Sequence, residues 1–290
     1  MRIAVTGSTG LVGARLVREL ASTHEVLPVS RHTRPALDLT DRSATLAFLK
    51  HAQPEVIVHC AAMPDVDACE REPAAAWAIN VEAVATLAQW TRDAQAHLVH
   101  VSTDYVFDGA TGRYAIDAVP NPTGAYAMSK HAAELAVRTL VPAGHWAIAR
   151  TAVVMGWPAQ HKGNFGTWLI DGLRAGKPLN VFSDQTITPT HATNAAQMIA
   201  ELATTRATGI WHASGAEVTD RFSFAQRLAR RFGLDAALLQ PVLMRDVALA
   251  KTRPMHAGLN VDRTVEALKA KPWSLDQSLE QLFAEFKEHS

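Results

Sequence analysis

The side chains best suited to proton transfer are Tyr126 and Lys130, four residues apart in the stretch Tyr126-Ala127-Met128-Ser129-Lys130. On a helix this spacing places both side chains on one face, one turn apart. A phenol has an unperturbed pKa of about 10, which a neighbouring ammonium lowers because it favours the phenolate. A tyrosine tuned in this way exchanges protons near neutral pH. The pair indicates an acid–base site, although ordinary surface pairs on helices share the same spacing.

Three polar residues, Ser102, Thr103 and Asp104, precede this pair in the chain. They follow residues 97–101, which are predicted to form a strand. The carboxyl ends of parallel strands form the rim on which doubly wound sheets bind their ligands. We therefore expect these three residues to lie on such a rim.

The start of the chain has the order of a dinucleotide-binding unit. Residues 2–6 form a short β-branched run, and Gly7, Gly10 and Gly13 follow before a helical pattern begins. Gly7 allows a tight turn, Gly10 lets the backbone approach a pyrophosphate at the helix N-terminus, and Gly13 lets the helix pack on the strand. The spacing is GxxGxxG, and the alternative interpretation is an ordinary strand–turn–helix joint.

The second predicted strand, residues 25–30, bears on the identity of the cofactor. Where an acidic residue would hold the 2′-hydroxyl of a ribose, the chain has Ser30 and Arg31. A guanidinium suits a 2′-phosphate, so NADP(H) is preferred and NAD(H) remains an alternative. Asp38 precedes a helix capped by Thr40 or Asp41, and it is either a ligand or only a turn residue.

The alternation of strands and helices predicts an α/β fold with a Rossmann-type, doubly wound parallel sheet. Residues 1–156 are expected to form the NAD(P)-binding domain, to which later segments can return. Residues 157–290 are expected to form mainly a smaller substrate-binding α/β lobe. Because no flexible linker separates the two parts, we expect them to pack together and close a cleft.

Composition narrows the classes of partner. The 290 residues contain 28 Lys plus Arg and 28 Asp plus Glu, so nothing favours nucleic acid or an anionic membrane surface. No apolar segment approaches the roughly 20 residues that span a bilayer. Cys60 and Cys69 are too few for a disulfide framework, and a cytoplasmic location is the simplest expectation. The histidines lack metal-ligand spacing, so no metal site is predicted.

With these segments in place, the chain resembles the extended short-chain dehydrogenases/reductases, and more narrowly the dTDP-4-dehydrorhamnose reductase group. The matching segments are spread over nearly the whole chain, and the STDYVFDG stretch is the most specific of them. They are residues 5–13, 38–40, 59–62, 102–109 and 126–130, together with Asn164-Phe165, Asp184-Gln185, Pro189-Thr190 and Arg253-Pro254.

The resemblance implies a role for each matching position. The catalytic trio would be Thr103, Tyr126 and Lys130, and the substrate would contact Thr103, Asp104 and Val153. The cofactor would be held at its pyrophosphate by Gly7, Gly10, Leu11, Val12 and Gly13, at its 2′-phosphate by Arg31, at its adenine by Asp38 and Leu39, and along the remainder by Ala61, Ala62, Met63, Ser102, Tyr126 and Lys130.

The implied reaction is NADPH-dependent reduction of the 4-keto group of a nucleotide-activated deoxysugar, and the group's members are often homodimers. The chain departs from the group at three places. Val153 and Met155 stand where rhamnose-forming relatives usually carry Trp and Tyr, and His256 stands where Asn is usual. Loss of the Trp removes a flat wall for a sugar. The magnesium-binding acids of some relatives have no assignable counterpart.

Two alternatives stay open within the same fold. The chain also resembles the regulatory β subunit of methionine adenosyltransferase, through residues 53–62 and 209–215. That resemblance implies a non-catalytic, NADP-binding partner protein. The other alternative is a sugar-nucleotide epimerase or dehydratase, which would keep NAD bound; Arg31 argues against it.

Overall fold

The computed structural model describes residues 1–157, 163–247 and 252–289. Its centre is a six-stranded parallel sheet with the order β10-β5-β4-β3-β1-β2. The strands are β1 (Arg2–Thr6), β2 (Glu25–Val29), β3 (Val56–His59), β4 (His97–Thr103), β5 (Trp146–Thr151) and β10 (Gly209–His212). The order runs outward from β1 in both directions, so a crevice opens at the carboxyl ends of β1 and β3. The expected Rossmann-type α/β fold is confirmed.

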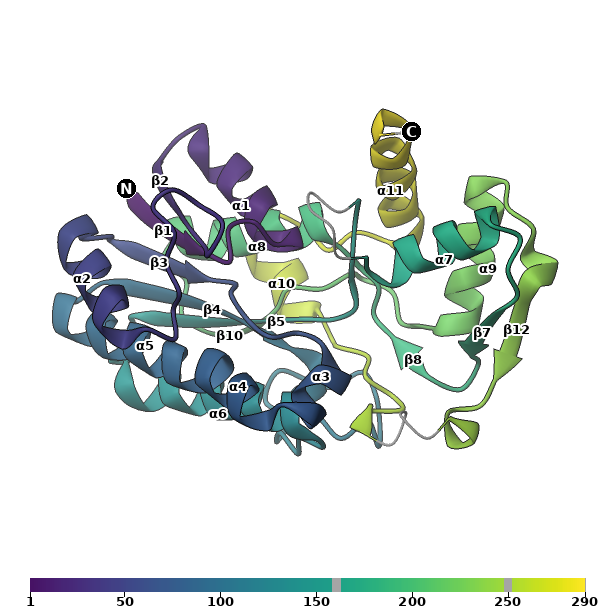
Figure 1. Ribbon diagram of the computed structural model, residues 1–290, viewed down its shortest axis with the longest axis horizontal. Helices are drawn as coiled ribbons and strands as arrows, with labels where there is room; N and C mark the ends of the chain where they lie inside the picture. The colour runs from purple at the N-terminus through teal and green to yellow at the C-terminus, as the bar shows by residue number, and fades with distance from the viewer. Residues whose placement is uncertain (158–162, 248–251, 290) are drawn as a thin grey trace.

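Helices cover both faces of this sheet (Figure 1). On one face α1 (Leu11–Ala21) packs beside α8 (Ala192–Thr204). On the other face lie α2 (Arg42–Ala52), α5 (Ala83–Ala94) and α6 (Ala125–Leu140). Because both faces are buried, most residues of the strands are apolar. The two resulting cores centre on Ile3, Leu16, Val99 and Ile199 on the first face, and on Leu49, Ile57, Leu87, Leu98 and Val137 on the second.

Short helices connect β3 with α5. They are α3 (Val66–Arg71), α4 (Pro73–Trp77) and the single π-helical turn η1 (Ala78–Glu82). Asp65 caps α3 by accepting a hydrogen bond from the backbone N–H of Ala68 at 2.9 Å. A π-helical turn is uncommon inside a helix and often marks a functional position.

A second, smaller α/β lobe has its own core (Figure 1). Its parallel strands β7 (Leu179–Phe182) and β12 (Leu239–Val242) pack against helices α7 (Phe165–Arg174), α9 (Arg221–Phe232) and α11 (Leu275–His289). Two short strand pairs join this lobe to the sheet region: β6 (Val154–Met155) with β9 (Thr190–His191), and β8 (Thr186–Ile187) with β11 (Thr219–Asp220).

The chain passes more than once between the two parts. After β7 it returns, through α8 and β10, to the part that contains the six-stranded sheet, which we call the sheet half. It then enters the lobe again at α9. Later still, α10 (Asp262–Ala267) packs on β10. Residues beyond 156 therefore complete the sheet. None of the helices within the described residues is long and apolar enough to cross a bilayer.

Candidate active site

The turn after β1 brings the backbone of three segments into close contact. Gly7 has φ of +64°, and a Cβ added there would lie 2.7 Å from the backbone N of Ala61. A Cβ on Gly13 would lie 2.2 Å from the carbonyl oxygen of Gly7. Both positions therefore exclude any side chain, as the glycine turn of a nucleotide site requires.

The N-terminus of α1 is open to an anion. Its N-cap, Gly10, offers no side-chain capping bond, so the backbone N–H groups of the first turn are not capped by a side chain. Beside it, the buried Oγ of Ser8 has no hydrogen-bond partner among the described residues. A tight turn, an uncapped helix N-terminus and an unpartnered hydroxyl fit the pyrophosphate of a dinucleotide. Leu11 and Val12 lie half-buried in the same turn.

Arg31, Asp38 and Leu39 lie just beyond β2. Arg31 is exposed, whereas Leu39 is buried. The carboxylate of Asp38 accepts hydrogen bonds from Thr40, at 2.9 Å from its backbone N–H and 2.7 Å from its hydroxyl. These bonds, helped by the charge of Arg31, lower the pKa of Asp38. Asp38 is thus a turn residue in this structure, and α2 is capped by Asp41.

The segment after β3 is supported by Asn80 in the π-helical turn. Its side chain accepts from the backbone N–H of Met63 at 2.8 Å and donates to the Met63 carbonyl at 3.3 Å. It also donates to the hydroxyl of Ser129 on α6 at 3.0 Å. Asn80 is fully buried, so it fixes residues 61–63 relative to the helix that carries Tyr126 and Lys130.

Helix α6 begins one residue before Tyr126 and is capped from another helix. Gly124 precedes it with φ of +84° and provides no capping side chain. Instead, the carboxylate of Glu70 on α3 accepts a hydrogen bond from the backbone N–H of Ala125 at 2.5 Å. A carboxylate at a helix N-terminus also interacts favourably with the helix dipole. Glu70 therefore stabilises the turn that carries Tyr126.

Lys130 lies against β4 and is almost completely buried. Its Nζ donates to the carbonyl of Val101 at 2.8 Å and lies 3.4 Å from Nε2 of His100. Burial lowers the pKa of Lys130 to about 8, while the charges of Glu134 and Cys60 oppose that shift. The ammonium is thus directed toward the strand.

Tyr126 is half-buried and lies edge-on to Tyr105, with ring centroids 6.0 Å apart. Burial raises its pKa above the ordinary value, and a hydrogen bond with Thr103 acts in the opposite direction. The predicted lowering of this pKa by Lys130 is therefore not found, because burial dominates and the Lys130 ammonium bonds to β4 instead. Such a phenol keeps its proton at neutral pH.

At the end of β4, Thr103 and Asp104 are buried beside this phenol. The Thr103 hydroxyl donates to Oδ1 of Asp104 at 3.0 Å and accepts from the backbone N–H of Tyr105 at 3.2 Å. Burial raises the pKa of Asp104 to about 7, although the bond from Thr103 opposes the shift. Oδ2 of Asp104 and Oγ of Ser102 have no partner among the described residues.

The lobe contributes Arg221, which the sequence analysis did not single out. Its guanidinium lies 4.5 Å from the ring centroid of Phe165 and donates to Gln185. Burial raises the pKa of Tyr105, and the charge and hydrogen bond of Arg221 oppose that shift. The charge of Arg221 also opposes the upward shift in the pKa of Asp104. The first residue of α9 thus reaches the rim of the sheet half.

Val153 lies between β5 and β6 and has φ of +33°, which is a rare conformation for a β-branched residue. Its carbonyl accepts a hydrogen bond from the backbone N–H of Thr190 at 3.2 Å. A strained residue of this kind persists only where the surrounding structure holds it.

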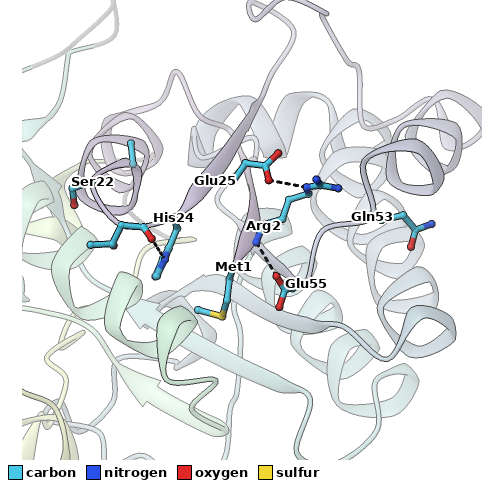
Figure 2. Close-up of a pocket in the computed structure, with 9 residues that line it drawn as sticks. Met1, Arg2, Ser22, His24, Glu25, Gln53 and Glu55 are labelled. Carbon is cyan, nitrogen blue, oxygen red and sulfur yellow. Dashed lines mark hydrogen bonds and ion pairs between the residues drawn. The ribbon is translucent and has the colours of Figure 1, made fainter.

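A surface hollow at the opposite edge of the sheet is not a candidate site. It is lined by Met1, Arg2, Glu25 and Glu55 at the amino ends of the strands (Figure 2). Arg2 pairs with Glu25 at 3.1 Å, and its backbone N–H donates to Glu55 at 3.0 Å. The polar groups of Arg2, Glu25 and Glu55 are thus paired with one another, and the hollow lies at the amino ends of the strands, whereas Thr103 lies at the carboxyl end of β4. The described part of the chain contains no group of three acidic, His or Cys side chains that could hold a metal ion.

Some residues at the site were missed by the sequence analysis. Glu70 and Arg221 carried no motif, because each acts from an element remote in sequence. His59 and His100 did leave a signal: each interrupts an apolar strand, and strand pairing places them opposite each other.

Comparison with known proteins gives consistent results over the whole chain. The family model described as the RmlD substrate binding domain matches residues 1–288. The chain is 35% identical to a dTDP-4-keto-6-deoxy-D-glucose reductase of Streptomyces niveus over 267 residues, covering 92% of this chain and 91% of that protein. It is 32% identical to methionine adenosyltransferase 2 subunit beta of Bos taurus over 273 residues, covering 90% and 81%.

Solved structures agree with these similarities. The structure of dTDP-4-dehydrorhamnose reductase from Bacillus anthracis, in complex with NADP, superposes with a TM-score of 0.89 at 28% identity. The match covers 98% of this chain and 99% of that one.

Proposed function

The chain belongs to the family of the RmlD substrate binding domain and is an NAD(P)-dependent oxidoreductase, and we propose that it reduces the 4-keto group of a nucleotide-activated deoxysugar with NADPH. The predicted membership in the dTDP-4-dehydrorhamnose reductase group is confirmed. The observation that carries the proposed reaction is the placement of a protonated phenol, Tyr126, beside Thr103 and Asp104 at the carboxyl end of β4.

The residues that would hold the cofactor fit its shape and charge. The turn at Gly7 and Gly13 admits no side chain, and the start of α1 and the Ser8 hydroxyl offer donors to a pyrophosphate. Residues 61–63 would lie along the remainder, and the exposed Arg31 would take a 2′-phosphate. The relative crystallised with NADP supports this choice.

When bound, NADPH supplies a hydride to the carbonyl carbon. The chain's own residues handle the oxygen and the proton. Tyr126 donates its phenolic proton to the developing alkoxide, and its raised pKa keeps that proton in place beforehand. Thr103 can turn its hydroxyl from Asp104 to the keto oxygen. Lys130, one helical turn after Tyr126, would supply the positive charge of a buried ammonium to the site.

Tyr126→Phe tests this assignment directly. A general acid contributes about 10²–10⁴ in rate, so turnover with NADPH and a 4-keto-6-deoxysugar nucleotide should fall by that factor. Binding of NADPH, followed by its fluorescence, should change little. The matched control is Tyr114→Phe, because the Tyr114 hydroxyl bonds to Asp108 outside the site. Equal turnover in the Tyr126→Phe variant and the wild type would refute the assignment.

The proposal also concerns the identity of the nucleotide and of the sugar in the substrate. The Streptomyces niveus relative is named for a dTDP-linked 4-keto-6-deoxyglucose, which supports a dTDP-linked substrate here. A panel of dTDP-, UDP- and GDP-linked 4-keto-6-deoxysugars, with NADPH and NADH in parallel, would rank both choices by kcat/KM. Faster turnover of the UDP or GDP compounds would overturn the dTDP assignment.

A second candidate is a regulatory, NADP-binding subunit, and the similarity to methionine adenosyltransferase 2 subunit beta favours it. This candidate requires a stable complex with another protein and no ketone reduction. Size-exclusion chromatography with the catalytic subunit of a methionine adenosyltransferase distinguishes the two. Failure to co-elute, together with NADPH oxidation on a 4-keto sugar nucleotide, would eliminate this candidate.

A further inference from the structure

Two buried histidines lie side by side in the sheet beneath Lys130. His59 on β3 and His100 on β4 are register partners, and neither side chain is exposed beyond 1%. Their rings are stacked, with centroids 5.5 Å apart and planes inclined by 17°. Both strands are otherwise apolar at this depth, so two imidazoles are an unusual filling for the core.

The hydrogen bonds of these rings fix their orientation. Nε2 of His100 lies 3.4 Å from Nζ of Lys130, and Nδ1 of His59 lies 2.7 Å from the hydroxyl of Thr6. An ammonium has three donors and no acceptor, so Nε2 of His100 must accept. His100 therefore carries its proton on Nδ1, which has no partner among the described residues.

Both rings are neutral. Burial, and then the charge of Lys130, lowers the pKa of His59 to about 3 and the pKa of His100 well below its ordinary value. The other titratable groups facing Lys130 are Glu134 on its own helix and Cys60 after β3. Neither makes a hydrogen bond to Nζ in the described structure. The two acceptors of Nζ, on His100 and Val101, both lie on β4.

We propose that His100, held in place by His59 and Thr6, is a positioning residue that fixes the ammonium of Lys130 in the active site. The column Thr6–His59–His100–Lys130 starts at the last residue of β1, next to Gly7, and ends on α6. It links the turn that would hold the pyrophosphate to the helix that carries Tyr126. With two of its donors bound to β4, Lys130 has one N–H left for the site. This inference rests on the proposed reductase function.

Two substitutions of His100 separate its acceptor from its ring. His100→Phe keeps a flat ring against His59 and removes the acceptor, whereas His100→Gln keeps an acceptor and removes the ring. Loss of an acceptor from the charged form lowers the pKa of Lys130, so the alkaline limb of the kcat profile should move about one unit lower in His100→Phe. Because the pKa of Lys130 is about 8, the turnover of His100→Phe at pH 8 should fall about fivefold, with KM for NADPH little changed.

The outcomes of this comparison are distinct. His100→Gln should keep most of the turnover, and the alkaline limb of its kcat profile should lie at the same pH as in wild type. His97→Phe, the same change at the far end of β4, is the control and should leave the pH profile unmoved. Wild-type turnover and limb in His100→Phe would overturn the proposal. Equal losses in the Gln and Phe variants would also overturn it, since that result would assign the effect to the packing of this buried position and not to the acceptor.

A measurement that needs no turnover separates this inference from the proposed function. In ¹⁵N-labelled wild-type protein at pH 7, the ¹⁵N shifts of His100 should show a neutral ring protonated on Nδ1. The pKa of the Lys130 ammonium, followed by its ¹⁵N shift, should be lower in His100→Phe than in wild type. If wild type reduces no keto sugar but both shifts are as expected, the reductase function fails and the positioning of Lys130 stands. An Nε2-protonated His100 would overturn the positioning.

Discussion

The sheet half and the lobe each contain an ion pair that joins two elements, and the two pairs differ in their exposure to water. In the sheet half, Glu134 on α6 and Arg150 on β5 form an ion pair with each partner only 1% exposed, at 2.9 and 2.7 Å. In the lobe, α9 and α11 are joined by Arg231 and Glu280, whose side chains are 31% and 67% exposed. Water screens the second pair and is excluded from the first.

This difference in exposure predicts at which pair the loss of a charge costs more stability. Removing one partner of a buried pair leaves an uncompensated charge, whereas removing one partner of an exposed pair changes little. The buried groups of the sheet half also surround Tyr126 and Lys130, and strongly perturbed pKa values concentrate at functional sites. The Arg231–Glu280 pair joins two helices at the surface of the lobe, whereas the Glu134–Arg150 pair lies in the interior of the sheet half.

The largest expected effect comes from breaking the buried pair. Glu134→Gln preserves the shape of the side chain but leaves the Arg150 guanidinium buried without its counter-charge. The free energy of unfolding, measured in urea, should fall by about 3–5 kcal/mol. The matched control is Glu280→Gln in the lobe, which should cost about 0–1 kcal/mol. Equal costs for the two variants would contradict the contrast between the halves.

A double replacement sharpens the same prediction. Glu134→Leu with Arg150→Met removes both charges and fills the space with apolar atoms. Such replacements of buried pairs are often neutral or stabilising, so most of the stability lost in Glu134→Gln should return. If the double variant is as unstable as the single one, packing against Phe107 matters more than charge; the centroid of the Phe107 ring lies 5.0 Å from the guanidinium carbon of Arg150.

The stability contributions of two carboxyl groups, the buried Asp104 and the half-buried Glu285, should respond to pH with opposite signs. In the sheet half, burial raises the pKa of Asp104 to about 7. In the lobe, burial also acts to raise the pKa of Glu285, but hydrogen bonds from His191, Trp157 and Arg15 outweigh it and lower the pKa to about 2. The folded state therefore favours a protonated Asp104 and an ionised Glu285.

For Asp104, the folded pKa lies above the unfolded value, so its contribution to stability is present below pH 4 and is lost as the pH rises through 7. Asp104→Asn should therefore raise the free energy of unfolding at pH 8 by about 1–3 kcal/mol relative to its effect at pH 4.

For Glu285 the contribution to stability is present above pH 4.5 and is lost as the pH falls toward 2. Glu285→Gln should therefore destabilise the protein at pH 8, and this loss should shrink on acidification. Urea titrations at several pH values measure the free energy of unfolding of both variants. A change of the same sign in the two variants between pH 4 and pH 8 would contradict the assignment.

The sequence predicted the parts of the site that depend on local patterns. The strand at residues 2–6, the turn at Gly7 and the helix carrying Tyr126 and Lys130 follow from periodicity and spacing within short segments. The sheet follows from the alternation of strands and helices. These features are fixed by neighbours in sequence, so local reasoning found them.

The other features of the site depend on contacts between segments that are distant in the sequence. The stacking of His59 on His100 requires the register of β3 against β4, and Glu70 reaches the start of α6 only because α3 packs there. The raised pKa of Tyr126 comes from burial, which spacing to Lys130 does not encode. Sequence patterns identify which groups are present, whereas packing decides their protonation and their partners.

The smallest expected effect lies at the junction of the two halves, where Val153 is held at φ of +33°. Val153→Gly should relieve about 1–3 kcal/mol of backbone strain. The greater freedom of glycine in the unfolded chain offsets about 0.4–1 kcal/mol. The net expectation is a rise of about 1 kcal/mol in the free energy of unfolding.

Gln53→Gly is the control for this last variant, because Gln53 has φ of +45° at the end of α2, inside the sheet half. Gln53 is not β-branched, and a left-handed residue is common at a helix C-terminus, so less strain is stored there. Its replacement should change the free energy of unfolding by less than that of Val153. If Val153→Gly instead destabilises the protein, the packing of its side chain at the junction outweighs the strain of its backbone. In that case the joint between the halves would be held by side-chain contacts, as the apolar cores are.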